Sequence, residues 1–149
     1  MSLEKRIATD LKEAMKAKDE ASKRGIRAIK NEISKFKTDG SGNELNEAAE
    51  IKMVQKLIKQ RQDSLTIYEE QGREDLAVIE REEMEVFKRY LPKQLSEADL
   101  KTLISSIIEE TGASSMKDMG RVMGMASKKV AGRADGKTIS SMVKQMLMG

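Results

Sequence analysis

Apolar residues recur every three or four positions along almost the whole chain, which is the spacing of amphipathic helices. The repeat is clearest near the carboxyl end, where Ile139, Val143 and Leu147 follow a period of 3.6 residues. Pro92 is the one proline in 149 residues, so little in the sequence interrupts helices. We find no alternating apolar and polar pattern of the kind that marks a half-buried strand. The sequence therefore predicts an all-α fold.

Turn and capping residues divide this pattern into seven predicted helices. Pro92 forces Leu91 out of helical geometry and provides the best domain boundary. We predict an N-terminal bundle of about four helices in residues 1–92 and a compact three-helix module in residues 96–149. The predicted N-caps are Asn46, Ser96, Ser115 and Asp135, and the predicted C-terminal glycines are Gly72, Gly112 and Gly132.

The amino-acid composition excludes several kinds of chemistry. The chain has no cysteine and no histidine, which rules out disulfides, thiolate catalysis, Ser-His-Asp triads and the usual zinc sites. We expect no catalytic residue, no metal and no cofactor. No apolar run approaches the ~20 residues that span a bilayer, so we expect no membrane partner. The amphipathic stretch from Leu3 to Lys18 contains Glu4, Asp10 and Glu13, unlike a mitochondrial presequence, and we predict a cytosolic (cytoplasmic) protein.

Positive charge is concentrated towards the carboxyl end. From Gly112 onward the sequence has seven Lys or Arg residues and two acidic residues, a net charge of +5, whereas the first 111 residues carry −2. Such an asymmetry favours an anionic partner for the C-terminal part.

The same part has an unusual set of glycines. Gly120, Gly124, Gly132 and Gly136 punctuate a helical pattern, and a glycine within a helix costs roughly 1 kcal/mol relative to alanine. We interpret them as sites where another helix or a ligand approaches the backbone closely.

Five segments carry a family resemblance: Lys59–Ser64 (KQRQDS), Gly72–Ala77 (GREDLA), Tyr90–Ser96 (YLPKQLS), Thr111–Gly120 (TGASSMKDMG) and Gly132–Lys137 (GRADGK). Together they resemble the YqeY family, over nearly the whole chain. The C-terminal part is also similar to the tail of GatB, the B subunit of the tRNA-dependent amidotransferase. The resemblance implies an all-helical fold and a label of carbon–nitrogen ligase with glutamine as amido-N-donor. Because the tail lies outside the catalytic centres of that enzyme and is thought to hold tRNA, it implies RNA contact rather than catalysis.

The candidate RNA-binding residues are cations and one glycine that lie away from the apolar stripe of the sixth predicted helix or flank that helix. The alternative is a solvated basic face, with Gly124 present for helix packing. Asp135 counts against a phosphate at the last helix, because its carboxylate already caps that helix. No aromatic residue follows Tyr90, so we expect recognition of RNA shape and backbone rather than base stacking. The candidates are Lys117, Arg121, Gly124, Lys128, Lys129, Arg133 and Lys137.

Three functions remain open at this stage. The first is a non-catalytic adaptor that binds tRNA or tRNA-handling machinery through the C-terminal module. The second is a component of a glutamine-dependent tRNA amidotransferase. The third is a helical protein-interaction module that uses the first four helices and has no role with RNA. The sequence does not predict an oligomeric state.

Three local patterns also carry expectations. Arg61 falls on an apolar stripe, and we predict that it pairs with a carboxylate on a neighbouring helix or lies along a groove edge; a buried polar site is the alternative. The acidic run Glu80, Glu82, Glu83 and Glu85 is predicted to form a solvated face, because adjacent positions point to different sides of a helix. The methionines from Met116 onward are predicted to fill a small core, with an adaptable binding groove as the alternative.

Overall fold

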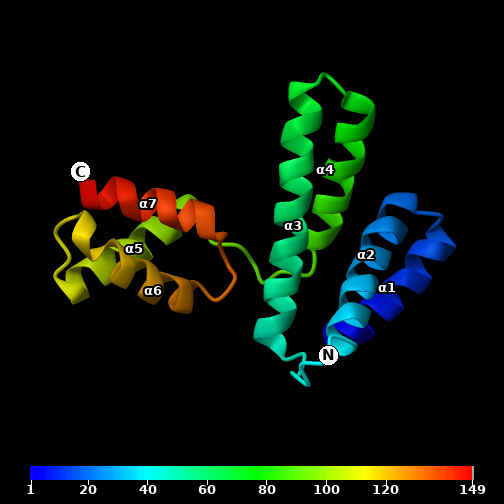
Figure 1. The fold of residues 1–149 in the computed structure, drawn as a ribbon, viewed down its shortest axis with the longest axis horizontal. Coiled ribbons are helices and arrows are strands. Elements are labelled where there is room, and N and C mark those ends of the chain that lie inside the picture. Colours follow the sequence, from blue (N-terminus) through cyan, green and yellow to red (C-terminus); the bar gives the residue numbers. More distant parts are fainter. Residues whose placement is uncertain (149) are drawn as a thin grey trace. The chain divides into compact units, whose positions relative to one another are not determined.

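The computed structural model describes residues 1–148, and they form two compact units that divide between Leu91 and Pro92 (Figure 1). The described residues contain seven α-helices and one short 3₁₀ helix, with no strand. The prediction of an all-α fold is therefore confirmed.

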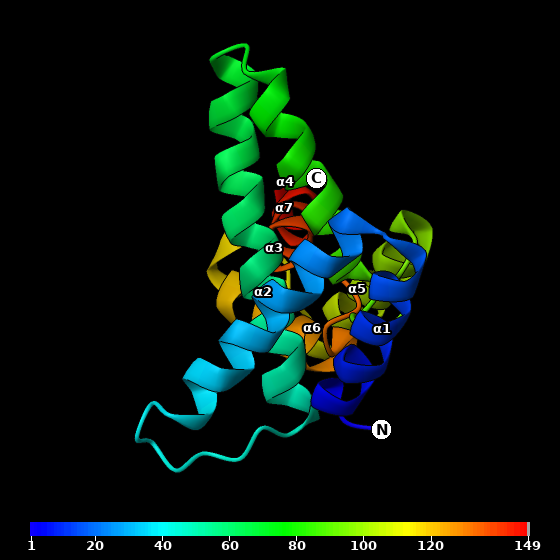
Figure 2. The same ribbon diagram turned by 90° about the vertical axis from the view of Figure 1, so that its right-hand side faces the viewer.

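The first unit consists of two helical hairpins. They are α1 (Leu3–Ala17) with α2 (Glu20–Lys37), and α3 (Glu47–Glu70) with α4 (Glu74–Lys88). The hairpins meet where α2 packs on α4. There a Cβ added to Gly25 would lie 2.6 Å from Cγ1 of Val86, so glycine is needed for the close approach of the two helices. The loop end of the α3–α4 hairpin extends past α2 (Figures 1 and 2).

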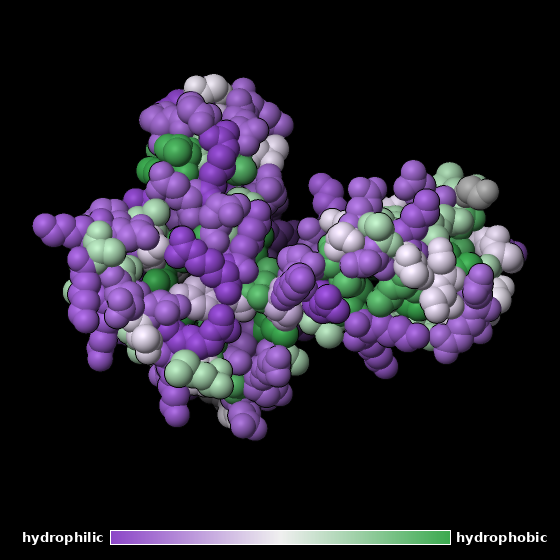
Figure 3. All heavy atoms as spheres, turned by 180° about the vertical axis from the view of Figure 1, so that it is seen from behind, coloured by the Kyte–Doolittle hydropathy of each residue, from purple (hydrophilic) through white to green (hydrophobic). Residues whose placement is uncertain are grey.

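The core of this unit is mostly aliphatic, with two buried aromatic residues, Phe87 and Tyr90. Ile26, Ile29, Val54 and Phe87 are almost completely buried in it. A smaller cluster around Leu65 fills the outer part of the α3–α4 hairpin. Hydrophilic side chains cover most of the surface seen in Figure 3, with apolar atoms visible between them.

The second unit consists of α5 (Glu97–Thr111), η1 (Met116–Asp118), α6 (Met119–Val130) and α7 (Gly136–Met148). Branched aliphatic residues and Ala126 fill its buried centre. The prediction of a methionine-filled core is wrong for that centre. Met116 and Met148 are exposed, and the methionines between them lie partly exposed around the aliphatic residues, because α5, α6 and α7 each direct one Ile, Leu or Val stripe inward.

Most of the predicted caps are confirmed. Each of three predicted N-caps accepts a hydrogen bond from the backbone amide three residues later. The distances are 2.9 Å for Asn46, 3.1 Å for Ser96 and 2.6 Å for Asp135. Ser115 differs, because it caps the 3₁₀ turn η1, and α6 begins only at Met119. At the end of α6 the predicted Gly132 is confirmed, with a left-handed φ of 83°, and Ala131 before it also takes a left-handed φ of 48°.

Candidate nucleic-acid interface

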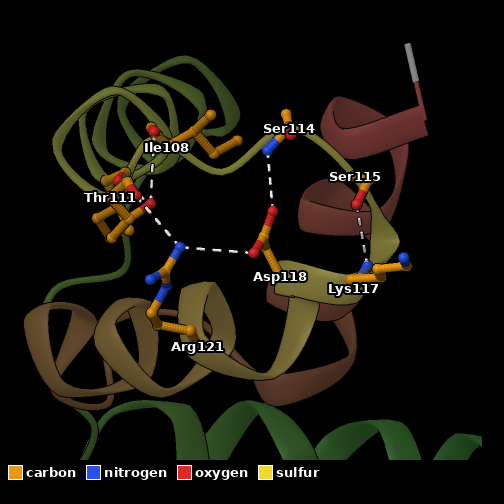
Figure 4. A network of polar contacts seen from close by, with 8 residues as sticks. Ile108, Thr111, Ser114, Ser115, Lys117, Asp118 and Arg121 are labelled. Carbon is orange, nitrogen blue, oxygen red and sulfur yellow. Dashed lines mark hydrogen bonds and ion pairs between the residues drawn. The ribbon is translucent and has the colours of Figure 1, made fainter.

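The start of the basic region is a corner in which α5 leads through η1 into α6 (Figure 4). Arg121 donates from Nη2 to the carbonyl of Thr111 at 3.2 Å and lies 3.5 Å from Oδ1 of Asp118. The other carboxylate oxygen of Asp118 accepts the amide of Ser114 at 3.0 Å, and this bond holds the pKa of Asp118 below its usual range. Figure 4 shows Arg121 directed towards the end of α5. Arg121 therefore fastens the corner by satisfying a carbonyl that the α5 helix leaves unpaired.

Arg133 has a comparable role at the α6–α7 turn. Its Nε donates to the carbonyl of Lys93 at 2.9 Å, and its own carbonyl accepts the amide of Leu95 at 2.8 Å. Gln94 adds a bond to the carbonyl of Gly132 at 3.1 Å. The segment that leads into α5 is thus joined to the turn in both directions. Arg133 remains exposed, and Nε is one of five donors in its guanidinium, so the fork can also meet an anion.

The remaining predicted cations differ in their partners. Lys129 pairs with Glu110 on α5 at 3.2 Å. Lys117, Lys128 and Lys137 are exposed, and none of them forms an ion pair with another residue in the described range 1–148. A polyanion could therefore bind these three lysines without displacing a carboxylate of the protein.

Helical geometry places Arg121, Gly124 and Lys128 on one face of α6, opposite the buried stripe through Val122 and Ala126. A Cβ added to Gly124 would meet nothing within 4 Å. The interpretation of Gly124 as a helix-packing residue is therefore wrong within the described chain, in contrast to Gly25. The backbone at Gly124 is therefore open to a ligand.

The seven predicted residues are spread along α6 and past its end rather than gathered in a single pocket, and we refer to them together as the basic strip; within it, Lys129 is turned towards Glu110 on α5. Lys117 lies just before α6, whereas Lys129, Arg133 and Lys137 lie near its end or beyond it. The 12 residues of α6 separate these groups by about 18 Å at 1.5 Å per residue. A strip of this length suits an extended polyanion better than a small ligand.

The first unit contains a cluster of charges that the sequence located only in part. Arg61 on α3 lies 2.6 Å from Glu83 on α4, which confirms its predicted pairing with a neighbouring helix. Glu83 also lies 3.7 Å from Arg24 on α2, and Arg24 lies 2.7 Å from Glu82. The guanidinium of Arg61 lies 5.7 Å from the centre of the Phe87 ring.

The predicted solvated face of α4 is wrong for two of its four acidic residues. The side chains of Glu80 and Glu83 are only 14% and 13% exposed. Adjacent positions do point to different sides of α4, but α2 and α3 cover two of those sides. Burial raises the pKa of Glu80. The arginines on α2 and α3 were the one sequence signal that could have indicated buried glutamates on α4. Their positions opposite α4, however, depend on the tertiary structure.

Comparison with known proteins places nearly the whole described chain in one family. The model of the family described as Yqey-like protein matches residues 4–147. The chain belongs to the YqeY-like family. Three yeast relatives carry the name "Altered inheritance of mitochondria protein 41, mitochondrial". The protein from Lachancea thermotolerans is 34% identical over 95% of this chain and 77% of its own length.

The other two relatives match smaller shares of both chains. The Clavispora lusitaniae protein is 34% identical over 72% of this chain and 63% of its own length. The Vanderwaltozyma polyspora protein is 32% identical over 76% of this chain and 64% of its own length. The family resemblance predicted from the five sequence segments is thus confirmed.

These names contradict one prediction made from the sequence. The relatives are named as mitochondrial proteins, so the predicted cytosolic localisation is wrong. Acidic residues in the amphipathic segment 3–18 were a poor guide, because Glu4 and Asp10 belong to contacts of the folded protein: Glu4 pairs with Lys37, and Asp10 accepts the hydroxyl of Tyr90. No helix within residues 1–148 has both the length and the apolar character needed to cross a membrane.

Proposed function

We propose that this YqeY-like protein is a non-catalytic helical adaptor that binds tRNA, or machinery that handles tRNA, through the basic strip of its second unit. The strip consists of Lys117, Arg121, Gly124, Lys128, Lys129, Arg133 and Lys137. The observation that carries the proposal is Gly124, a mid-helix glycine between two cations of the same face with open space over it.

Two further arguments support an RNA backbone as the partner. Exposed lysines without acidic partners neutralise phosphates and release counterions, which favours any polyanion. A glycine on the same face lets a phosphate or sugar approach the helix backbone. We take the polyanion to be tRNA because this part of the chain resembles the tail of GatB.

The test is a titration with tRNA at several salt concentrations, using two double variants of equal charge. Lys128→Glu/Lys137→Glu removes two cations of the strip. Lys101→Glu/Lys144→Glu makes the same charge change on α5 and α7 outside it. Each phosphate contact contributes about 0.9 to the slope of log affinity against log salt. We expect the first variant to lose roughly two units of slope and at least tenfold in affinity, and the second to lose much less.

Arg121 and Arg133 are unsuitable for this first test, because their reversal would also break the corner and the turn that they fasten. Equal losses in the two double variants would show that net charge, rather than the strip, controls binding. Binding by neither the parent nor the variants would refute the adaptor. Release of ammonia from glutamine in the presence of ATP and mischarged tRNA would instead favour the amidotransferase alternative.

A further inference from the structure

The first helical hairpin is as positively charged as the C-terminal segment. Residues 1–38 contain 11 Lys or Arg residues and 6 acidic residues, a net charge of +5. Residues 39–91, which include the second hairpin, contain 8 basic and 13 acidic residues, a net charge of −5. The balance of −2 over the first 111 residues therefore conceals a second cationic segment, α1 and α2, in which Lys23, Arg24, Lys35 and Lys37 are already paired with carboxylates.

The α1–α2 hairpin has a groove between its two helices. The groove has a volume of about 180 Å³, and its floor is made of buried isoleucines, among them Ile7, Ile26 and Ile33. Ala8 and Leu11 line the α1 side, and Lys30 lines the α2 side. The groove is thus apolar at depth, and its charged lining residues are Glu4, Lys30 and Lys37, a net charge of +1.

The groove follows the two helices along their length. Its lining runs from Glu4 to Leu11 on α1 and from Ile26 to Lys37 on α2. At 1.5 Å per residue these stretches are about 10 and 16 Å long, which is two to three helical turns. Met15, one turn beyond Leu11, is 54% exposed and extends the apolar line. A volume spread over this length receives a row of side chains at helical spacing, as in other helix-in-groove interfaces, rather than one compact molecule.

The charges at the rim select the partner. Lys37 pairs with Glu4 at 2.6 Å, but Lys30 forms no ion pair with any other described residue. A basic helix would meet repulsion from a hairpin of +5, whereas carboxylates beside an apolar stripe would meet Lys30 and its neighbours. We propose that the α1–α2 groove binds an acidic amphipathic helix of a partner protein. This proposal does not depend on RNA binding by the second unit.

The proposal can be tested with a designed probe and the full chain. The probe is an 18-residue peptide of glutamate, alanine and leucine, with leucines at i, i+3, i+4 and i+7. The control peptide has the same composition with the leucines scrambled. Binding is measured by calorimetry, and the site is mapped by changes in amide chemical shifts. We expect the patterned peptide to bind and to shift amides along α1 and α2.

Three variants separate the groove from general charge. Lys30→Glu reverses the rim, and Ala8→Phe fills the groove at an exposed position. Lys16→Glu makes the same charge change on α1 away from the groove. We expect Lys30→Glu and Ala8→Phe to weaken binding by at least tenfold with unchanged thermal melts, and Lys16→Glu to weaken it by less than threefold.

Several results would overturn the proposal. If the scrambled peptide binds as tightly as the patterned one, the row of leucines has no role. If Lys16→Glu loses as much affinity as Lys30→Glu, the effect is one of net charge. Binding of octanoate or of phosphatidylglycerol vesicles to the hairpin, without binding of the patterned peptide, would identify a fatty-acid pocket or a membrane surface instead. Amide shifts confined to the second unit would show that the peptide does not bind the α1–α2 groove.

Discussion

Two helix glycines allow the same substitution to be made with opposite expected outcomes. Gly124 lies in the middle of α6 and Gly25 lies within α2. Gly124→Ala adds a methyl group to open space, because nothing lies within 4 Å of the new Cβ. Gly25→Ala adds it against Val86, at 2.6 Å from Cγ1 and 2.7 Å from Cβ.

The expected magnitudes follow from these surroundings. For Gly124→Ala, the gain in helix propensity is about 1 kcal/mol and no contact opposes it. In a domain of this size such a gain raises the melting temperature by about 4–8 °C. For Gly25→Ala, the same gain is opposed by a clash close to the backbone of α4, and overpacking of this kind costs about 1–3 kcal/mol or more. We expect a net loss of about 1–2 kcal/mol for Gly25→Ala.

Urea denaturation with two probes measures both effects. Tyr68 and Tyr90 are the only tyrosines of the chain, so tyrosine fluorescence reports the first unit, while circular dichroism reports helices in both. Gly25→Ala should lower the midpoint seen by fluorescence. Gly124→Ala should raise the dichroism midpoint of the second unit and leave the fluorescence midpoint unchanged. A destabilised Gly124→Ala variant would refute the reasoning, because it would mean that the glycine already has a role within the chain.

If the stabilised Gly124→Ala variant also binds tRNA more weakly, glycine at this position favours tRNA binding although it lowers the stability of the second unit. A larger residue sharpens this comparison: Gly124→Leu should keep the helix and reduce tRNA affinity further. Unchanged affinity in both variants would remove Gly124 from the proposed interface.

Three further predictions concern stability alone. Ala131→Gly should stabilise the second unit by about 1 kcal/mol, because Ala131 holds a left-handed φ of 48° that glycine adopts without strain; an unchanged urea midpoint would contradict this. Arg61→Ala should cost about 2–3 kcal/mol in the urea midpoint of the first unit, because it leaves Glu83 half-paired in a mostly buried site, while Lys59→Ala on the exposed side of α3 serves as the control. Burial raises the pKa of Glu80 in the folded state, so protonation of Glu80 favours folding. Glu80 therefore contributes stability at acid pH, and this stability is lost as the pH rises through the raised pKa. Glu80→Gln should therefore be more stable than the parent at pH 7, and this advantage should disappear below about pH 4, where the parent carboxyl is also neutral.

The secondary structure was predictable because its signals are local. The capping bonds of Asn46, Ser96 and Asp135 span three residues, so the sequence alone places the helix starts that they mark. Prediction was less accurate at the start of α6, where Ser115 caps a 3₁₀ turn and the α-helix begins only at Met119.

The candidate site was predictable only as a set of residues. Charge counting identified the cations near the carboxyl end, but it did not show that Arg133 holds Lys93, which lies 40 residues earlier. Nor did it reveal the basic groove on α1 and α2, because the acidic α3–α4 hairpin balances its charge in any count over the whole N-terminal part.

What the sequence by itself determined is the all-helical fold, since helical periodicity and caps depend on neighbours a few residues apart. What only the tertiary structure decided is the role of each glycine and each charge. Gly25 and Gly124 look alike in the sequence, and so do Glu83 and Glu85, because nothing local distinguishes them. The physical reason is that burial and pairing depend on which distant helix lies opposite, and that is set by the packing of the whole unit.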